Sequence, residues 1–226
     1  MLDVNRDDYL CVGRQKFESL GPWLHGWEAS SEDPKTPDAS QMPAHAAELA
    51  KELLNAEILS EGPENTKDAR VTRLEPATCE LTSAVPVPAG KWRWYHVPIF
   101  FLSSVMASVQ LRICPLRSTI SYVAARKERA LRRQRRQGGK QIFDLERARI
   151  LVEAFEALRP WYWRPYVCTF DCLDLLNFLA WYGLFPEWVF GVTAEPFKAH
   201  CWLRSGRIVI NDTRVITDAF MPIMRV

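Results

Sequence analysis

The pattern of apolar and polar positions predicts a small unit of strands followed by helices at the N-terminal end. Residues 9–12 and 16–20 are short runs with the composition of strands. Residues 44–59 carry apolar side chains at positions 47, 50, 53, 54 and 58, which is the period of an amphipathic helix. Residues 30–43, rich in Ser, Asp and Pro, are expected to form a loop.

Prolines at positions 63, 76, 86 and 88 interrupt the next part of the chain, and this composition predicts a linker of mostly extended character. The expected organisation is therefore a first domain over residues 1–75, a proline-rich linker over 76–90 and a second domain over 91–226.

The longest apolar stretch, residues 97–111, predicts a buried helix with Pro98 in its first turn. It contains four polar residues and is too short to span a bilayer, so no transmembrane segment is expected. Because the basic and aromatic residues 91–96 precede it, docking on a membrane surface stays an alternative. The N-terminus lacks the apolar run of a secretory signal, which favours a cytoplasmic protein with reduced thiols.

A second helix is predicted between Pro165 and Gly183, because proline ends the preceding element and glycine is a common C-terminal stop. Within it, one helical face carries Cys168, Cys172, Leu175 and Leu179. Cys168 would lie at the helix N-terminus, where the dipole and the free N–H groups favour a thiolate and can stabilise an oxyanion. Cys172, one turn further in, is more simply a small buried hydrophobic residue.

A strand over residues 185–193 and a hairpin that contains His200 are predicted to follow. A two-residue loop at 205–206 would place His200 opposite Asn211 and turn Asp212 to the other face. A three-residue loop at 204–206, with Gly206 in the left-handed conformation, would bring Asp212 onto the face of His200. The second register supplies a thiol, an imidazole and an orienting carboxylate, as a thiol nucleophile requires.

Several alternatives remain for these residues. His200 by itself is most simply a structural strand residue, and the two-residue loop would make Asn211 its orienting group. A zinc site would use Cys168, Cys172, His200 and Cys201. Neighbours in a strand point to opposite faces, however, so His200 and Cys201 would not both reach one ion, and no metal is expected. The position of Cys172 inside an apolar helix argues against its being the nucleophile.

The motifs of this region resemble the B protein of lasso-peptide biosynthesis, a bacterial family of cysteine peptidases with a transglutaminase-like fold. The gaps are 32 residues from Cys168 to His200 and 12 from His200 to Asp212, as in single-chain members of the family. On this resemblance the catalytic triad is Cys168, His200 and Asp212, and neither Cys172 nor Cys201 is needed for the reaction. The matching positions are Cys168, Leu175, Leu179, Gly191, Val192, Pro196, Phe197, His200, Trp202, Gly206, Val209, Asn211 and Asp212.

The resemblance implies an α+β protein with two domains. A small winged-helix-like domain would recognise the leader peptide, and a transglutaminase- or papain-like domain would carry the cysteine on a helix and the His and Asp on an antiparallel sheet. Strand propensity suggests that the leader adds as a strand near Tyr9, Leu10 and Val12.

The function so implied is a hydrolase that removes the leader from a ribosomally synthesised lasso precursor. The precursor peptide and an asparagine-synthetase-like cyclase would be its partners. No directly bound cofactor is expected, although ATP could be required through the cyclase. A transglutaminase-like acyltransferase and a non-catalytic peptide-binding module are the alternatives.

The charge distribution adds little to this hypothesis. A net charge of +2 favours neither a nucleic-acid nor a membrane partner. Residues 126–140 include eight basic residues, which indicate either the solvated end of a helix or a patch for an acidic partner. No aromatic residues interleave this run, and the chain has no glycine-rich phosphate loop, so a nucleic-acid partner is not expected.

Overall fold

The structure is a computed structural model that describes residues 2–3, 8–9, 19–20, 23, 42–55, 74–81, 93–136, 143–193 and 196–226. The chain divides into two compact units, one made of residues 1–3 and 8–70 and the other of residues 4–7 and 71–226.

In the first unit, β1 (Leu2–Asp3) pairs antiparallel with β2 (Asp8–Tyr9). The strand predicted at 9–12 therefore begins within β2, while Leu10 and Val12 lie outside the described residues. The strand predicted at 16–20 is wrong at Ser19 and Leu20, which are helical. Leu20 is buried in a cluster with α2 (Ala44–Asn55), a contact that local sequence does not reveal.

The helix predicted in this unit is confirmed, but its buried face overlaps the predicted one only in part, at Leu53 and the partly buried Ala50. The residues that α2 buries are Ala46, Leu49 and Leu53, whereas Ala47 is exposed. Alanines occur on several faces of this helix, so more than one set of positions satisfies a helical period. The packing of Leu20 against α2 selects the face.

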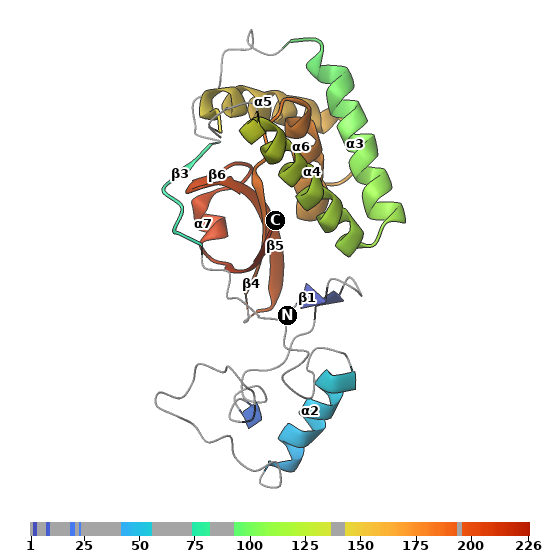
Figure 1. Ribbon diagram of the computed structural model, residues 1–226, viewed down its shortest axis with the longest axis vertical. Helices are drawn as coiled ribbons and strands as arrows, with labels where there is room; N and C mark the ends of the chain where they lie inside the picture. The colour runs from blue at the N-terminus through green and yellow to red at the C-terminus, as the bar shows by residue number, and fades with distance from the viewer. Residues whose placement is uncertain are drawn as a thin grey trace. The chain divides into compact units, whose positions relative to one another are not determined.

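The second unit contains a five-stranded sheet in the order β3-β6-β5-β4-β7 (Figure 1). Strand β3 is parallel to β6, and the other neighbours are antiparallel. The strands are β3 (Cys79–Glu80), β4 (Glu187–Thr193), β5 (Lys198–Ser205), β6 (Ile208–Val209) and β7 (Met221–Arg225). The strand predicted at 185–193 is thus confirmed as β4, and the short helix α7 (Arg214–Thr217) lies between β6 and β7 in the chain.

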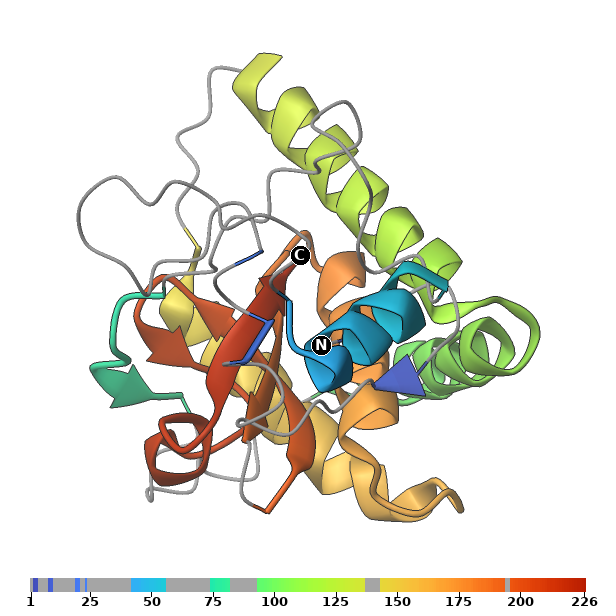
Figure 2. The same cartoon turned by 90° about the horizontal axis from the view of Figure 1, so that it is seen from below.

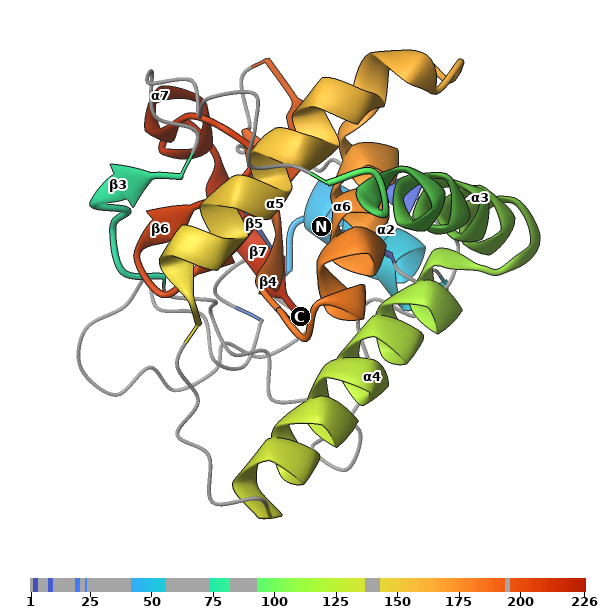
Figure 3. The same cartoon turned by 90° about the horizontal axis from the view of Figure 1, so that it is seen from above.

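Helix α6 (Cys168–Trp181) is the centre of this unit, packed between strand β5 and the helices α3 (His96–Ile113) and α5 (Leu145–Leu158) (Figure 3). All residues from 172 to 179 are buried, so the predicted single apolar face was incomplete. A helix that is buried on all sides is expected to be apolar around its circumference. The helix ends as predicted, with Gly183 at φ +78° and with Leu184 N–H bonded to the Leu179 carbonyl.

Helix α3 corresponds to the apolar stretch predicted as a buried helix, but only one of its faces is covered. That face contains His96, Phe100, Ser103, Ser104 and Ala107. The outer face exposes Phe101, Leu102, Val105, Val109 and Ile113. Among the described helices, α3 alone is long and apolar enough to cross a membrane, by length and composition.

Most of the basic run lies on α4 (Leu116–Arg136), whose C-terminal half extends away from α3 and α6 (Figures 2 and 3). Only Thr119 and Val123 of this helix are buried. Arg129, Arg132, Arg133, Arg135 and Arg136 are all exposed and lie on the extended half. Within the described part of the run, this arrangement matches the solvated helix end that the sequence allowed.

The segment predicted as a linker contains β3, which is part of the sheet. Within residues 74–81 only Cys79 and Glu80 form a strand, Ala77 and Leu81 are buried, and Leu81 N–H bonds to the Val209 carbonyl. This stretch is therefore part of the folded second unit and is not a free connection. The pairing joins positions about 130 residues apart, so no local pattern could reveal it.

Candidate active site

Cys168 is the first residue of α6, as the sequence predicted, and it is half-buried. Val167, the residue before it, has an extended backbone, and its side chain does not cap the helix. The Asp171 carboxylate instead accepts a hydrogen bond from the Val167 N–H at 2.8 Å. The N–H groups of the first helical turn therefore have no capping side chain and face the same end of the helix as the thiol.

His200 on β5 links the cysteine to Asp212. Its Nε2 atom is hydrogen-bonded to Asp212 Oδ2, and its side chain and the Cys168 thiol are close enough to shift each other's pKa. Because Nε2 faces the carboxylate, Nδ1 is the ring nitrogen that remains for the thiol. The side chains of His200 and Asp212 are 21% and 12% exposed, so the pair is largely shielded from water. The structure brings together the three residues that the sequence singled out.

Neither predicted hairpin loop is the one observed. Ser205 pairs with Ile208, so the loop consists of Gly206 and Arg207. Gly206, at φ +55°, occupies the first loop position, where the favoured two-residue hairpin turns require a positive φ. Asp212 reaches His200 because β6 ends at Val209 and the chain bends over residues 210–212.

Asn211, the alternative orienting group, is bonded elsewhere. Its Oδ1 atom accepts the Leu203 N–H at 2.7 Å, and its Nδ2 atom donates to Cys172 Sγ at 3.3 Å. Cys172 is fully buried and its thiol donates to the Cys201 carbonyl at 3.3 Å. Asn211 and Cys172 therefore tie β5 to α6 and take no part in the contact between His200 and Asp212.

The imidazole ring of His200 rests against two aromatic rings. Its centroid lies 6.1 Å from that of Trp202 and 5.1 Å from that of Phe220. Gly191 on β4 lies directly opposite His200 in the strand pairing. A Cβ atom at Gly191 would stand 2.9 Å from the Trp202 ring and 3.0 Å from Phe220. The absence of a side chain at this position therefore allows both rings to pack beside the histidine.

The pKa values of Cys168 and His200 are set by their neighbours. The hydrogen bond to Asp212, followed by that to Cys168, raises the pKa of His200 to about 9. The Cys201 thiol and burial raise the pKa of Cys168 to about 12, against the opposing effect of the hydrogen bond to His200. At neutral pH the pair therefore holds two protons, and it loses the first of them near pH 9.

Arg159 is a buried residue of the site region that the sequence did not reveal. It opens the 3₁₀ helix η4 (Arg159–Trp161), and its side chain is 1% exposed. Its Nε atom donates to Asp171 Oδ1 at 2.5 Å. Its terminal nitrogens donate to three carbonyl oxygens of the turn before Cys168, those of Tyr162, Arg164 and Pro165. One guanidinium thus holds the turn that leads into the nucleophile.

The same turn presents aromatic side chains to the solvent. Trp161, Trp163 and Tyr166 are 76%, 81% and 67% exposed. Tyr166 is two residues from Cys168, so their Cα atoms are at most about 7.6 Å apart. A rigidly bonded segment beside the thiol therefore carries large apolar groups on its outside.

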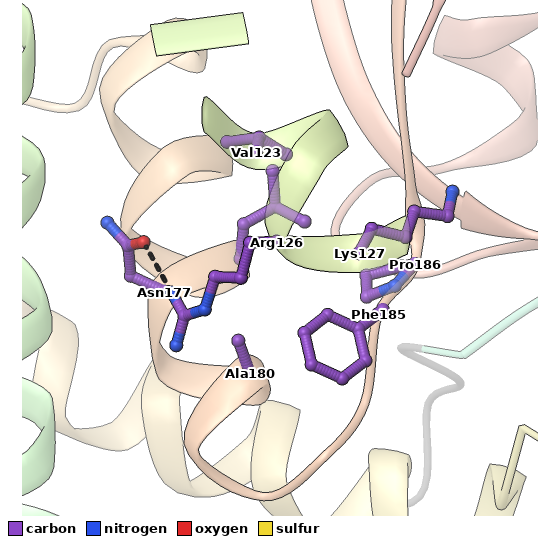
Figure 4. Close-up of a pocket in the computed structure, with 8 residues that line it drawn as sticks. Val123, Arg126, Lys127, Asn177, Ala180, Phe185 and Pro186 are labelled. Atoms are coloured by element: carbon purple, nitrogen blue, oxygen red, sulfur yellow. Dashed lines mark hydrogen bonds between the residues drawn. The ribbon is translucent and has the colours of Figure 1, made fainter. Parts of the chain in front are cut away.

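The hollow drawn in Figure 4 is a separate feature. It lies between α4, α6 and the segment before β4, and Arg126 donates to Asn177 Oδ1 at 3.2 Å on its wall. Asn177 is about 14 Å along α6 from Cys168. Its lining residues are Val123, Arg126, Lys127, Leu176, Asn177, Ala180, Phe185 and Pro186. The hollow is therefore too far from the thiol to hold the reacting part of a substrate.

In the described part of the chain, no group of three or more His, Cys, Asp or Glu residues is arranged to hold an ion. Cys168, Cys172, His200 and Cys201, the set considered for zinc, are all described and do not form such a group.

Residues 110–225 match the family described as the transglutaminase-like superfamily. Searches of curated proteins and of solved structures found no match. The matched range includes Cys168, His200 and Asp212.

Proposed function

Because the chain belongs to the transglutaminase-like superfamily, a grouping compatible with cysteine peptidases and acyltransferases, we propose that it is a cysteine peptidase that removes the leader from a lasso-peptide precursor. The observation that carries the proposal is the hydrogen bond of His200 to Asp212, together with the mutual influence of His200 and the Cys168 thiol on each other's pKa. A nucleophile, a base within reach and a group that orients the base are the parts of a thiol acyl-transfer site.

In the proposed mechanism, the sulfur of Cys168 attacks the carbonyl carbon at the junction of leader and core. His200 Nδ1 takes the thiol proton and delivers it to the leaving amine of the core. Asp212 is hydrogen-bonded to the Nε2 atom of His200, which orients the ring and stabilises the imidazolium. Water then attacks the acyl-enzyme, with the same imidazole accepting its proton, and releases the leader acid.

The oxyanion of each tetrahedral intermediate would be stabilised at the start of α6. The N–H groups of the first helical turn have no capping side chain, and they carry the positive end of the helix dipole. Donors of this kind act where charge develops during acyl transfer.

The exposed aromatic segment at 161–167 supports a peptide as the substrate. Arg159 holds the backbone of this segment while Trp161, Trp163 and Tyr166 face the solvent. Aromatic side chains supply large contact areas at low entropic cost, which suits binding of an extended chain. We propose that these side chains contact residues close to the scissile bond.

The remaining parts of the proposal follow from the resemblance. The N-terminal unit would bind the leader in a winged-helix-like domain, with the leader adding as a strand near Tyr9, Leu10 and Val12. The freed core amine would pass to an asparagine-synthetase-like cyclase that uses ATP, in the bacterial cytoplasm.

The test is to incubate the protein with a lasso precursor, ATP and the cyclase and to weigh the products. Release of free leader supports the proposal. A mass gain at the junction would indicate acyl transfer, and an unchanged precursor would indicate binding alone. Cys168→Ala should abolish leader release, whereas Cys172→Ser, a matched change one turn along the same helix, should retain most of it. The reverse result would overturn the assignment of the nucleophile.

A further inference from the structure

The thiol of Cys201 neighbours that of Cys168, although the proposed reaction uses only Cys168. Cys201 is the largest cause of the raised pKa of Cys168, and the Cys172 thiol in turn influences the pKa of Cys201. Acyl transfer requires a base and an oxyanion site beside the nucleophile, but it gives no role to a second thiol in contact with it.

The core of the second unit holds this pair of thiols in place. Cys168 begins α6, Cys201 lies on β5, and these two elements pack directly against each other. The sulfur of Cys201 also lies 3.9 Å from the hydroxyl of Thr169, the residue after Cys168. A disulfide requires neighbouring Cβ atoms and sulfurs that can approach to about 2 Å. Because the Cys201 sulfur already lies beside the residue that follows Cys168, a local movement of the two side chains can meet that requirement.

The two thiols differ in access to solvent. Cys168 is half-buried and open to a small reagent, whereas Cys201 is 2% exposed. A soluble oxidant therefore meets Cys168 first, and Cys201 reacts only through it. An accessible thiol beside a buried one has the spatial arrangement of a reacting cysteine and its resolving cysteine. The raised pKa of Cys168 keeps its thiolate scarce at neutral pH, so the first step is expected to be faster at alkaline pH.

We propose that Cys201 is a resolving cysteine, so that oxidation of Cys168 by a hydroperoxide ends in a reversible disulfide between the two. This modification would switch the site off, a consequence that rests on the proposed function, whereas the disulfide itself does not.

The chemistry balances in two steps. The Cys168 sulfur attacks one oxygen of hydrogen peroxide, the O–O bond breaks, and the departing hydroxide leaves as water with the proton that the thiol gave up. The sulfur of Cys201 then attacks the sulfenic sulfur of Cys168, the S–O bond breaks, and the oxygen leaves as a second water with the Cys201 proton. Two thiols are oxidised by two electrons in total and one peroxide is reduced.

The experiment uses the full chain with Cys11, Cys79 and Cys114 changed to serine, which removes the thiols outside the cluster. The protein is treated with hydrogen peroxide and digested without reductant, and its peptides are weighed. The expected product is a cross-linked peptide pair containing Cys168 and Cys201, two hydrogen atoms lighter than the free peptides and separated again by dithiothreitol.

Two variants decide the role of Cys201. In Cys201→Ser, Cys168 should proceed to the sulfinic and sulfonic acids, which dithiothreitol does not reverse. Cys201→Ala should behave in the same way, and circular dichroism checks that each variant is folded. In Cys172→Ser the Cys168–Cys201 disulfide should still form. Irreversible oxidation of Cys168 in the protein that retains Cys201, or a cross-link between Cys168 and Cys172, would overturn the proposal.

The failure of this inference is distinguishable from the failure of the proposed function. The cross-link is detected by mass and needs no substrate, whereas leader release is measured on reduced protein before peroxide is added. A cross-link in a protein that releases no leader keeps the disulfide and rejects the peptidase. Leader release without the cross-link supports the peptidase and rejects the disulfide.

Discussion

At the scale of single residues, the bonds of His200 to a carboxylate and to a thiol set the expected pH dependence. Its raised pKa of about 9 means that both protons remain on the Cys168–His200 pair at neutral pH. The reactive form has lost one of them. The rate of Cys168 alkylation by iodoacetamide should therefore rise by about tenfold per pH unit below 9 and level off above it.

Mass-spectrometric measurement of Cys168 labelling over a range of pH checks this expectation. Asp212→Asn removes the largest cause of the raised His200 pKa, so in this variant the rate of Cys168 alkylation should rise at lower pH. A labelling rate that does not change with pH across the neutral range would contradict the assignment of the pair.

A second residue-scale prediction concerns Gly191. In Gly191→Ala the new methyl group would collide with the Trp202 ring and with Phe220, the two rings that flank His200. Overpacking of this kind lowers the free energy of unfolding by roughly 1–3 kcal/mol. Denaturant unfolding should show this loss, and Cys168 alkylation should slow because the imidazole is displaced.

Gly183→Ala is the matched control for this variant. Gly183 has a φ of +78°, lies at the far end of α6, and has no neighbouring atom within 4 Å of the place that an added methyl group would take. The control should lose stability through backbone strain alone and keep the alkylation rate of Cys168. Equal slowing in both variants would show that the effect comes from lost stability and not from the packing around His200.

At the scale of elements, the turn before α6 depends on Arg159. The guanidinium bonds to Asp171 and to three carbonyls of this turn. Arg159→Lys keeps the charge but lacks the planar fork, so buried carbonyls lose their donors. The free energy of unfolding should fall by about 1–3 kcal/mol, and the kcat of leader release should decrease. Arg149→Lys, in a surface pair on α5, is the control and should change neither value.

The aromatic segment that this turn supports gives a prediction about substrate binding. Trp163→Ala should raise the KM for leader release about 2- to 10-fold, the equivalent of one aromatic contact, with kcat little changed. Trp181→Ala removes another exposed indole, at the other end of α6 and about 20 Å along the helix from Cys168. It should leave KM unchanged. A fall in kcat without a change in KM in Trp163→Ala would reject the substrate contact.

At the scale of the whole molecule, Asp174 links the stability of the second unit to pH. It is completely buried in α6, where the Ser104 hydroxyl donates to its Oδ2 atom at 2.6 Å, and its Oδ1 atom has no partner among the described residues. Burial raises its pKa from 3.8 to about 7. The folded protein therefore holds this proton more tightly than the unfolded chain does.

The stabilisation from this proton is complete below the unfolded value of 3.8 and is lost as the pH rises to about 7. The free energy of unfolding should decrease across this window by at most about 1.4 kcal/mol per pH unit. Asp174→Asn, which retains an acceptor for Ser104, should flatten the curve. Denaturant unfolding at several pH values measures this, and an unchanged slope in the variant would assign the pH dependence to other groups.

The sequence by itself determined the elements whose ends follow local rules. Pro165 and Gly183 delimit α6 because proline disfavours a preceding helix and glycine adopts a positive φ at its end. The positions of Cys168 at the helix start and of β4 followed from the same kind of pattern.

Only the tertiary structure decided how these elements meet. The observed hairpin loop is not one of the two that the sequence predicted, because several turn types are compatible with a single glycine. The bend after Val209 then brings Asp212 to His200. The Cys201 thiol reaches the site through packing of β5 against α6, and the Arg159 guanidinium reaches it by folding back onto the turn that it precedes. Burial and contact between residues far apart in the chain carry no local periodicity, so they become visible only once the chain is folded.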